Sequence, residues 1–402
     1  MGANYHGLFR SPLSLILAAA AILCIIVLRR TRLARLCSEG RTASILMAAA
    51  TILLAIEGSW PLQVHRNAAF IAIIAMLMFS LGQSVLQNRG SLGGKLCHIG
   101  LFLVLAGGLF GAIDITEATI RVNEGSAENT ALGSDGKAFP LPFYISLEDF
   151  EIETYEGTSS PRQYTSTIEI DGRMLQTGVN HPARHKGWRI YQTSYGEDQS
   201  GTYTVLKVVK NPWLAVVALG AILLAAGALL SMGSVWRSRK ILLPVVLLAA
   251  VFTLISLARI NFGTLQPALR SLWFVPHLAV YMLAYAVLAL AVIAGIGSRL
   301  SGKVPQGLER KLLSTASSLL LIGMTCGAVW AQQAWGSYWT WDPKECWAAA
   351  TWLLTLAATH LPSKHRKAVL CLTIIAFLAM NITWYGVNYL PSSEVSLHTY
   401  NR

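Results

Sequence analysis

Charged residues are scarce in this chain of 402 residues, at 13%, whereas 54% of the residues are hydrophobic. The six cysteines include no CxxC pair and no CxxCH motif, and none of them lies between residues 114 and 210. These absences exclude a disulfide framework, a thiolate zinc site and covalent attachment of c-type haem to the chain itself. The sequence also lacks an internal repeat, a Walker loop, a Rossmann fingerprint and a Ser/His/Asp constellation.

Apolar residues occur in runs of about 17 to 22 residues, which are long enough to cross the hydrocarbon core of a bilayer as helices. We therefore predict an all-α polytopic membrane protein with about ten transmembrane helices. The predicted spans are residues 11–28, 42–57, 67–86, 96–113, 212–231, 241–258, 275–296, 312–330, 347–361 and 368–387. The first run precedes the basic stretch RRTRLARLCSEGR without a small-residue cleavage pattern, so we expect it to be retained.

Positive charge marks one side of these spans. Of the 32 lysines and arginines, 17 lie in five connections, at residues 29–41, 87–95, 232–240, 297–311 and 362–367. By the positive-inside rule these connections lie on the cytoplasmic side of a bacterial inner membrane, and both termini lie outside. The net charge of +12 is then mainly a topology signal. Basic residues spread over short loops give little support for nucleic-acid binding.

One long polar segment, residues 114–210, holds 14 of the 20 acidic residues and falls on the outer side. Its stretches RQYTSTIEIDGRMLQTGVN and GWRIYQTSYGEDQSGTYTVLKVVK alternate apolar and polar residues, and Asp171 with Gly172 suits a tight hairpin turn. We predict a small β-rich extracytoplasmic domain here. It separates helices 1–4, in residues 1–113, from helices 5–10, in residues 211–402.

Four of the nine histidines fall at matched depths in the predicted bundle. His98 and His360 lie at the cytoplasmic ends of their spans, whereas His277 and His398 lie on the outer side. Imidazole is the usual protein ligand for haem iron and is costly to leave idle in lipid. We therefore predict two haem-ligating histidine pairs, which we call the inner pair (His98 and His360) and the outer pair (His277 and His398).

A histidine taken singly at the end of a span is more often an interfacial or hydrogen-bonded residue than a ligand. Matched depth is what favours the pairs. His65 also lies near the outer face and could replace a member of the outer pair. His6, His181, His185 and His365 lie in polar or basic stretches, where we expect solvated surface.

The stretch AWGSYWTWDPKECWAAATW, residues 334–352, contains five tryptophans. An aromatic belt at the membrane interface explains some of them. Asp342, Pro343 and Glu345 fit an N-cap, a first-turn proline and the returning acid of a capping box, so we expect both acids to shape the loop rather than to transfer protons. This explanation needs no ligand, but it leaves the crowding of WGSYWTW unexplained.

A planar ligand would explain that crowding. If the loop were helical, Trp335, Trp339 and Asp342 would share one face, and Gly336 would admit the ligand closely. A porphyrin has large apolar faces that indoles, including that of Trp341, can cover.

Haem also carries two propionates, which would suit Lys344 or an outer arginine such as Arg259 or Arg270. We therefore predict that haem b is held edge-on between His277 and His398, against the tryptophan loop.

These residues also resemble a known family. WGSYWTWDPKE matches every fixed position of the WGxxWxWDxxE signature of haem-handling proteins of cytochrome c maturation. HIGLFLVLAGGLFGA and GVNHPARHKGWRIYQTSYG resemble the ResB (CcsB) component that partners them. From about residue 60 onward the chain is therefore similar to a fused ResB/ResC, CcsBA-type cytochrome c synthase of system II, although its outer segment is short for a ResB-like protein.

The resemblance implies a holocytochrome c synthase, or cytochrome c haem lyase, whose substrates are haem and an apocytochrome c with a reduced CxxCH motif. It implies uptake of haem at the inner pair, transfer outward to the outer pair, and orientation of haem by the signature loop. The implied site residues are His98, His360, His277, His398, Trp335, Gly336, Trp339, Trp341, Asp342 and Glu345. A thiol-reducing protein on the outer side and membrane lipid are the further partners that we expect.

Two other functions remain open at this point. A haem exporter or haem-delivery protein would share the tryptophan signature but lack the ResB-like half and the ligation step. A b-type electron carrier would usually set two histidines on one helix, one for each leaflet, and no predicted span does so. A solute transporter would require broken spans or charges at mid-membrane, of which the sequence offers little.

Overall fold

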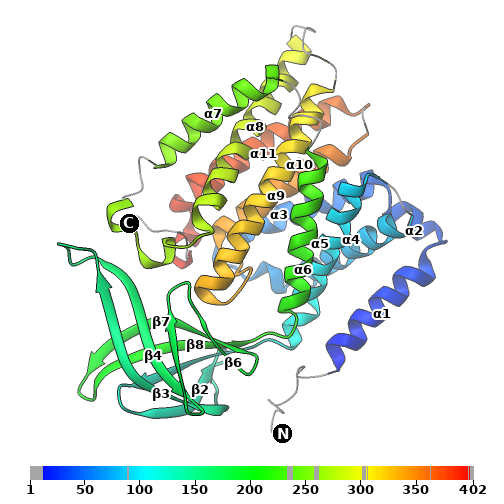
Figure 1. Ribbon diagram of the computed structural model, residues 1–402. Coiled ribbons are helices and arrows are strands. Elements are labelled where there is room, and N and C mark those ends of the chain that lie inside the picture. Colours follow the sequence, from blue (N-terminus) through cyan, green and yellow to red (C-terminus); the bar gives the residue numbers. More distant parts are fainter. Residues whose placement is uncertain are drawn as a thin grey trace.

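The computed structural model describes residues 12–87, 90–232, 239–257, 262–300, 305, 307–362, 364–396 and 398. It consists of a helical bundle with an antiparallel β domain at one end (Figure 1). The helices are α1 (Leu13–Leu28), α2 (Arg32–Cys37), α3 (Gly40–Ser59), α4 (Ala68–Leu86), α5 (Leu92–Leu109), α6 (Leu214–Ser231), α7 (Arg239–Leu257), α8 (Phe274–Leu300), α9 (Leu308–Trp335), α10 (Pro343–His360) and α11 (Arg366–Trp384). The short 3-10 turns are η1 (Val64–Arg66), η2 (Gly111–Ile113), η3 (Phe262–Thr264), η4 (Pro267–Leu269), η5 (Gly386–Tyr389) and η6 (Pro391–Val395).

All of these α-helices except α2 occupy the ranges predicted as spans, but fewer of them qualify as membrane-crossing. Among the described residues, seven helices are long and apolar enough to cross a membrane: α3, α4, α5 with its extension to Ile113, α6, α8, α9 and α11. The apolar helix α1 has only 16 residues, and α7 contributes the apolar stretch Leu243–Ile255 among the residues whose side chains are described. Helix α10 begins with Pro343, Lys344 and Glu345, which lower its hydropathy. The chain is a multi-pass membrane protein, but the predicted count of about ten spans is not confirmed.

The β domain is one antiparallel sheet, as the alternation of apolar and polar residues predicted. Its strands are β1 (Thr116–Asn123), β2 (Ala127–Gly133), β3 (Ala138–Thr154), β4 (Pro161–Ile170), β5 (Arg173–Gly178), β6 (Ala183–His185), β7 (Trp188–Asp198) and β8 (Gly201–Lys210). Their order is β5-β4-β3-β2-β1-β8-β7-β6. Asp171 and Gly172 join β4 to β5 with φ angles of 51° and 74°, as the predicted hairpin turn requires.

The sheet curls so that its two ends meet. The Thr177 hydroxyl on β5 donates to the Ile190 carbonyl on β7 over 2.7 Å, and Gly178 forms a bridge with His181. The enclosed core is apolar and includes Ile145, Leu147, Ile168, Ile170, Leu206 and Val208. His185 is also buried and contacts the Asp171 carboxylate at 3.0 Å, so the expectation of a solvated surface histidine was wrong there. His181 is exposed as expected, and His6 lies outside the described residues.

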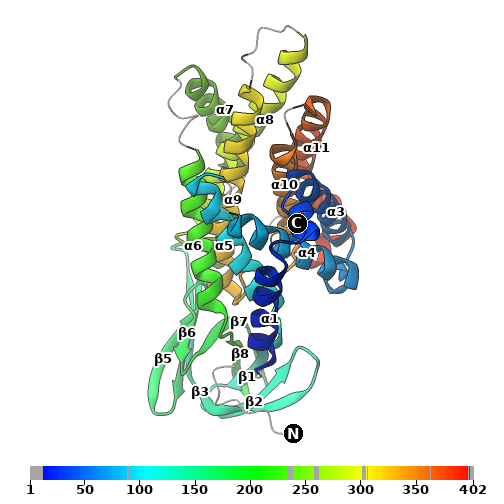
Figure 2. The same ribbon diagram turned by 90° about the vertical axis from the view of Figure 1, so that its right-hand side faces the viewer.

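Helices α5 and α6 lead into and out of the β domain and lie side by side (Figure 2). Glycines permit this close approach: a Cβ on Gly100 would lie 2.6 Å from the Gly220 carbonyl oxygen, and one on Gly227 would lie 2.6 Å from that of Gly93. Small residues at helix contacts are the usual means of close packing in membranes. The β domain is therefore attached to the bundle through a tightly packed helix pair.

The two halves of the chain also meet along α3 and α10, which lie together in Figure 2. The Ser44 hydroxyl on α3 donates to the Ala357 carbonyl on α10 over 2.9 Å. At the other end of the same helix, a Cβ on Gly58 would lie 2.7 Å from the Trp347 ring. Helix α3 of the first half of the chain is thus packed against the helix that carries His360.

Candidate functional site

The predicted inner pair is brought together by two helices from opposite halves of the chain. His98 lies on α5 and His360 ends α10, with ring centroids 6.5 Å apart and ring planes 29° apart. The His360 Nδ1 atom lies 2.8 Å from the Leu356 carbonyl oxygen. Since a carbonyl only accepts hydrogen bonds, Nδ1 carries the ring proton and Nε2 keeps a lone pair. This is the tautomer that can ligate iron through Nε2.

His277 of the outer pair lies in the first turn of α8, against α9. Its Nδ1 atom donates to the Gly323 carbonyl over 2.8 Å, which again leaves the lone pair on Nε2. A Cβ on Gly327 would lie only 2.6 Å from His277 Cε1. The absence of a side chain at Gly327 therefore lets the imidazole lie against α9, whereas the corresponding space at Gly323, one helical turn earlier, is occupied by the Tyr281 ring.

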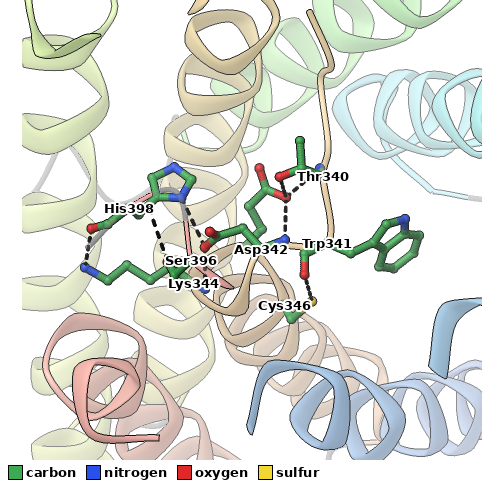
Figure 3. Close-up of polar contacts among 8 residues, drawn as sticks. Thr340, Trp341, Asp342, Lys344, Cys346, Ser396 and His398 are labelled. Carbon is green, nitrogen blue, oxygen red and sulfur yellow. Dashed lines mark hydrogen bonds and ion pairs between the residues drawn. The ribbon is translucent and has the colours of Figure 1, made fainter. Parts of the chain in front are cut away.

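His398 lies beside the beginning of α10 (Figure 3). Its Nδ1 atom is 3.0 Å from Asp342 Oδ1, and its backbone carbonyl accepts a 3.0 Å hydrogen bond from Lys344 Nζ. Burial alone would raise the pKa of the Asp342 carboxyl, but the hydrogen bond from His398 and its charge outweigh burial, so this pKa lies below its ordinary value. Asp342 thus fixes the orientation of the His398 ring.

Trp330 connects the two histidines of the outer pair. Its ring centroid is 6.0 Å from that of His277 and 6.0 Å from that of His398. Trp335, the last residue of α9, is 5.7 Å from Trp330 and 5.6 Å from His398. The sequence prediction missed Trp330, although its position at the outer end of the predicted span 312–330 was an available signal.

The predicted capping box is confirmed. The backbone N–H of Lys344 donates to Asp342 Oδ1 over 2.8 Å, and the backbone N–H of Asp342 donates to Glu345 Oε2 over 3.2 Å. Glu345 also accepts from the Thr340 backbone over 2.7 Å (Figure 3). Both acids therefore shape the loop, and Asp342 additionally holds His398.

The tryptophan loop does not present one helical face. Residues 336–342 are not helical, and Trp341 has a positive φ of 61°. Its indole points away from His398 (Figure 3) and stacks on His65, with ring centroids 4.6 Å and ring planes 4° apart. Trp339 contacts Trp341 edge-on at 6.1 Å. The loop is therefore not helical, and Trp335, Trp339 and Trp341 do not share one face. Trp335 contacts His398 of the outer pair, whereas Trp341 contacts His65.

His65 lies on the Trp341 side of the loop rather than with the outer pair. Its Nδ1 atom is 2.8 Å from the buried carboxylate of Glu57, which also accepts from the His65 backbone over 2.9 Å. Glu57 and His65 thus support Trp341 in its unusual backbone conformation.

Gly336 was predicted to admit a planar ligand and Arg270 to bind its propionates, but both residues contact other parts of the chain. Tyr191 of the β domain occupies the space beside Gly336, because a Cβ there would lie 2.9 Å from Tyr191 Cε2. Arg270 donates to the Arg162 carbonyl over 3.2 Å, and Arg259 lies outside the described residues.

Two other donors are available in the loop. The indole Nε1 atoms of Trp335 and Trp339 are buried and have no hydrogen-bond partner within the described parts of the chain. Unpaired buried donors are costly, so each favours an acceptor that the polypeptide does not supply.

Two family models match consecutive parts of the chain. The model of the ResB-like family matches residues 89–203, and that of the cytochrome c assembly protein family matches residues 208–393. The cytochrome c biogenesis protein CcsA of Prochlorococcus marinus strain NATL1A is 31% identical over 223 residues, with 41% of this chain and 68% of that protein covered. The chain belongs to the CcsA family. A ResB-like segment precedes the CcsA-like segment, so this is a fused ResB/CcsA cytochrome c biogenesis protein.

Two further CcsA relatives cover less of their own length. CcsA of Prochlorococcus marinus strain AS9601 is 32% identical over 179 residues, covering 34% of this chain and 57% of the relative. CcsA of Porphyra purpurea is 30% identical over 192 residues, covering 34% and 59%. The chain thus spans little more than half the length of these relatives.

The β domain of the ResB-like segment contacts α9 of the CcsA-like segment at a buried glutamine, Gln332. Gln332 Nε2 donates to the Tyr191 hydroxyl over 2.8 Å, and Gln332 Oε1 accepts from Arg189 Nη1 over 3.1 Å. Gln332 lies three residues before Trp335. Both ends of the Gln332 amide are therefore hydrogen-bonded to β7 of the β domain.

A second contact lies before α8. Asn180 Nδ2 donates to the Pro267 and Ala268 carbonyls over 3.0 and 3.1 Å, and Trp330 Nε1 donates to the same Ala268 carbonyl over 2.9 Å. The β domain is thus hydrogen-bonded to α9, which carries Trp330 and Trp335, and to η4, which precedes the helix that carries His277.

Replacing Gln332 by alanine is expected to lower the thermal midpoint of unfolding of the purified protein. The change leaves the buried Tyr191 hydroxyl and Arg189 without their partner, at a cost of about 1–3 kcal/mol. Tyr191→Phe removes only one of the two hydrogen bonds and should cost about 1 kcal/mol. Thermal unfolding in detergent measures both, with the exposed His181→Ala as control. An unchanged midpoint in Gln332→Ala would contradict the assigned contact.

Proposed function

We propose that this protein is a holocytochrome c synthase of the bacterial inner membrane. It moves haem b from the cytoplasmic to the outer side and joins it through thioether bonds to the CxxCH motif of apocytochrome c. The basic connections face the cytoplasm, and both termini and the β domain face outward. Haem is here a substrate that the protein binds at two successive sites, first at the inner pair and then at the outer pair.

The observation that carries this proposal is the hydrogen bonding of the histidines. In His277 and His360 the Nδ1 atom donates to a backbone carbonyl, and in His398 it contacts a carboxylate. None of the side-chain hydrogen bonds or ion pairs found for these three residues within the described part of the chain involves Nε2. Metal-ligating histidines commonly show this pattern, because the second contact fixes the tautomer and orients the ring.

The surroundings of the outer pair also fit haem. Trp330 and Trp335 supply apolar ring faces next to both histidines, which suit a porphyrin. The buried indole N–H group of Trp335 is suited to a propionate oxygen. Trp339, Trp341, Gly336 and Glu345 act on the site by shaping the loop. Asp342 acts more directly because it orients His398.

Each ligation event adds a cysteine S–H across a haem vinyl C=C bond. A carbon–sulfur bond forms, the S–H bond breaks, and the hydrogen ends on the neighbouring vinyl carbon, so no external oxidant is consumed. The chain needs no acid–base residue for this addition. Its role is to hold haem still while two thiols approach two vinyl groups, which converts a slow encounter into an intramolecular step. A thiol-reducing protein on the outer side would keep the CxxCH cysteines available.

Coexpression of the protein with a c-type reporter tests the function. The host lacks all other cytochrome c maturation genes, and covalent haem in the reporter is measured after acid extraction. We expect covalently bound haem with the protein and none without it. If the purified protein contains haem while the reporter contains none, haem delivery without ligation is the function instead.

A further inference from the structure

A basic groove lies where the ResB-like domain meets the first turns of α6. It consists of two adjoining cavities of about 530 and 300 Å³. Lys186, Arg189 and Lys210 line the larger one, and the smaller one adds Arg184. Neither cavity is lined by a carboxylate among the described residues, although Asp171 reaches Lys186 Nζ at 2.6 Å from outside the lining. The groove therefore favours an anion.

The opposite wall of the groove is apolar and continues along a membrane helix. Ala215 and Ala218 line the larger cavity. They share a helical face with Leu219 and Ile222, which are 51% and 65% exposed, because Leu219 follows Ala215 by four positions and Ile222 follows Ala218 by four. α6 is one of the helices long and apolar enough to cross a membrane. The groove thus opens onto a surface that lipid chains cover.

The groove is separate from the outer pair. Gln332 lines its smaller cavity, whereas Trp330 contacts His277 and His398. Two residues along an α-helix correspond to a rotation of about 200°, so these side chains leave α9 on opposite sides. A ligand in this groove therefore lies on the opposite side of α9 from His277 and His398.

We propose that the basic groove binds an anionic phospholipid of the outer leaflet. The phosphate lies among Lys186, Arg189 and Lys210, and an acyl chain lies along the Ala215 to Ile222 face of α6. Basic clusters beside membrane helices attract anionic headgroups, and a ligand with both a charged and an apolar part fits both walls. The leaflet, but not the binding site itself, depends on the membrane orientation proposed above.

A bound phospholipid would brace the ResB-like domain next to the Gln332 contact. Arg189 lies at both places, since it donates to Gln332 and lines the groove. Occupancy of the groove is therefore expected to stabilise the junction between the two segments against thermal unfolding.

Native mass spectrometry and thermal unfolding of the full chain test this proposal, with phosphatidylglycerol, phosphatidylcholine and inorganic phosphate as probes. Phosphatidylglycerol is expected to remain bound and to raise the midpoint of unfolding, whereas phosphatidylcholine and inorganic phosphate leave it unchanged. The double variant Lys186→Gln with Lys210→Gln is expected to bind phosphatidylglycerol about tenfold more weakly or worse. The charge-preserving variant Lys186→Arg with Lys210→Arg and the distant surface change Lys137→Gln should bind normally.

A second variant keeps the test independent of charge. Ala218→Trp fills the apolar wall and is expected to displace the acyl chain while all basic groups remain. Equal binding of phosphatidylglycerol by both groove variants and the wild type would overturn the proposal. So would a stabilisation by inorganic phosphate as large as that by phosphatidylglycerol. If the glutamine variant lost haem and kept the lipid, the groove would belong to the haem route, whereas loss of haem from His277→Ala with normal lipid binding would leave the two sites independent.

Discussion

Replacing His277 by alanine is expected to reduce covalent haem in a coexpressed reporter cytochrome by on the order of 100-fold. The change removes the proposed iron ligand, whose ring is oriented by the Gly323 carbonyl of α9. The purified variant should keep haem at the inner pair and lose it at the outer pair. Visible spectra and a pyridine haemochrome assay of the purified protein measure the loss, and the reporter measures its consequence.

Two further variants test whether the loss results from removal of an iron ligand. His277→Met supplies a different axial ligand and should retain haem with a raised reduction potential. His181→Ala, an exposed histidine of the β domain, should change neither haem content nor reporter yield. Wild-type haem content and reporter yield in His277→Ala would show that the outer haem is bound elsewhere.

The same ligand can be displaced without being removed. In Gly327→Ala the new Cβ would lie 2.6 Å from His277 Cε1, so the imidazole must turn away from α9. We expect the outer haem to be lost although every histidine remains. Gly108→Ala is the matched control, because a Cβ there has no atom within 4 Å.

Replacing His98 or His360 by alanine is expected to have an equally large effect, but with a different spectrum. Haem enters at the inner pair in the proposed route, so either change should empty both sites and lower total haem by on the order of 100-fold. His277→Ala, in contrast, should retain the inner haem. The pyridine assay therefore distinguishes the two sites.

The haem content of the double variant of His98 and His360 tests whether the two histidines form one site. The two rings are 6.5 Å apart, and residues that act as a unit have non-additive effects. The double variant should therefore be no worse than either single variant. His365→Ala, five residues beyond His360, serves as control and should retain haem. Independent, additive losses would contradict a shared ligand role.

Local sequence patterns predicted much of the fold. The capping box at Asp342 and Glu345 depends on groups within three residues of each other, and the turn at Asp171 and Gly172 depends on two residues with positive φ. Alternation of apolar and polar residues likewise predicted the β domain. The number of spans was harder to predict, because α1 has only 16 residues and α10 begins with polar residues.

The sequence predicted how deep each histidine of the candidate site lies in the membrane, but not the direction in which each side chain leaves its helix. Counting residues along a span gives the height of a histidine in the membrane, and this brought His98 together with His360. Rotation about a helix axis and the path of a loop depend on distant contacts. Trp341 turns away because Glu57 and His65, in the first half of the chain, hold it. The contact of Gly336 with Tyr191 and that of Trp330 with His398 also join residues far apart in the sequence, which local patterns do not predict.

The inner pair takes one histidine from α5, in the ResB-like segment, and one from α10, in the CcsA-like segment. If these segments were separate proteins, such a pair would exist only while the two were associated. Within one chain each histidine meets the other at an effective concentration in roughly the millimolar range or above, whatever the amount of protein in the membrane. The fused chain therefore makes assembly of the inner pair independent of dilution, and it fixes the ratio of the two segments at one to one.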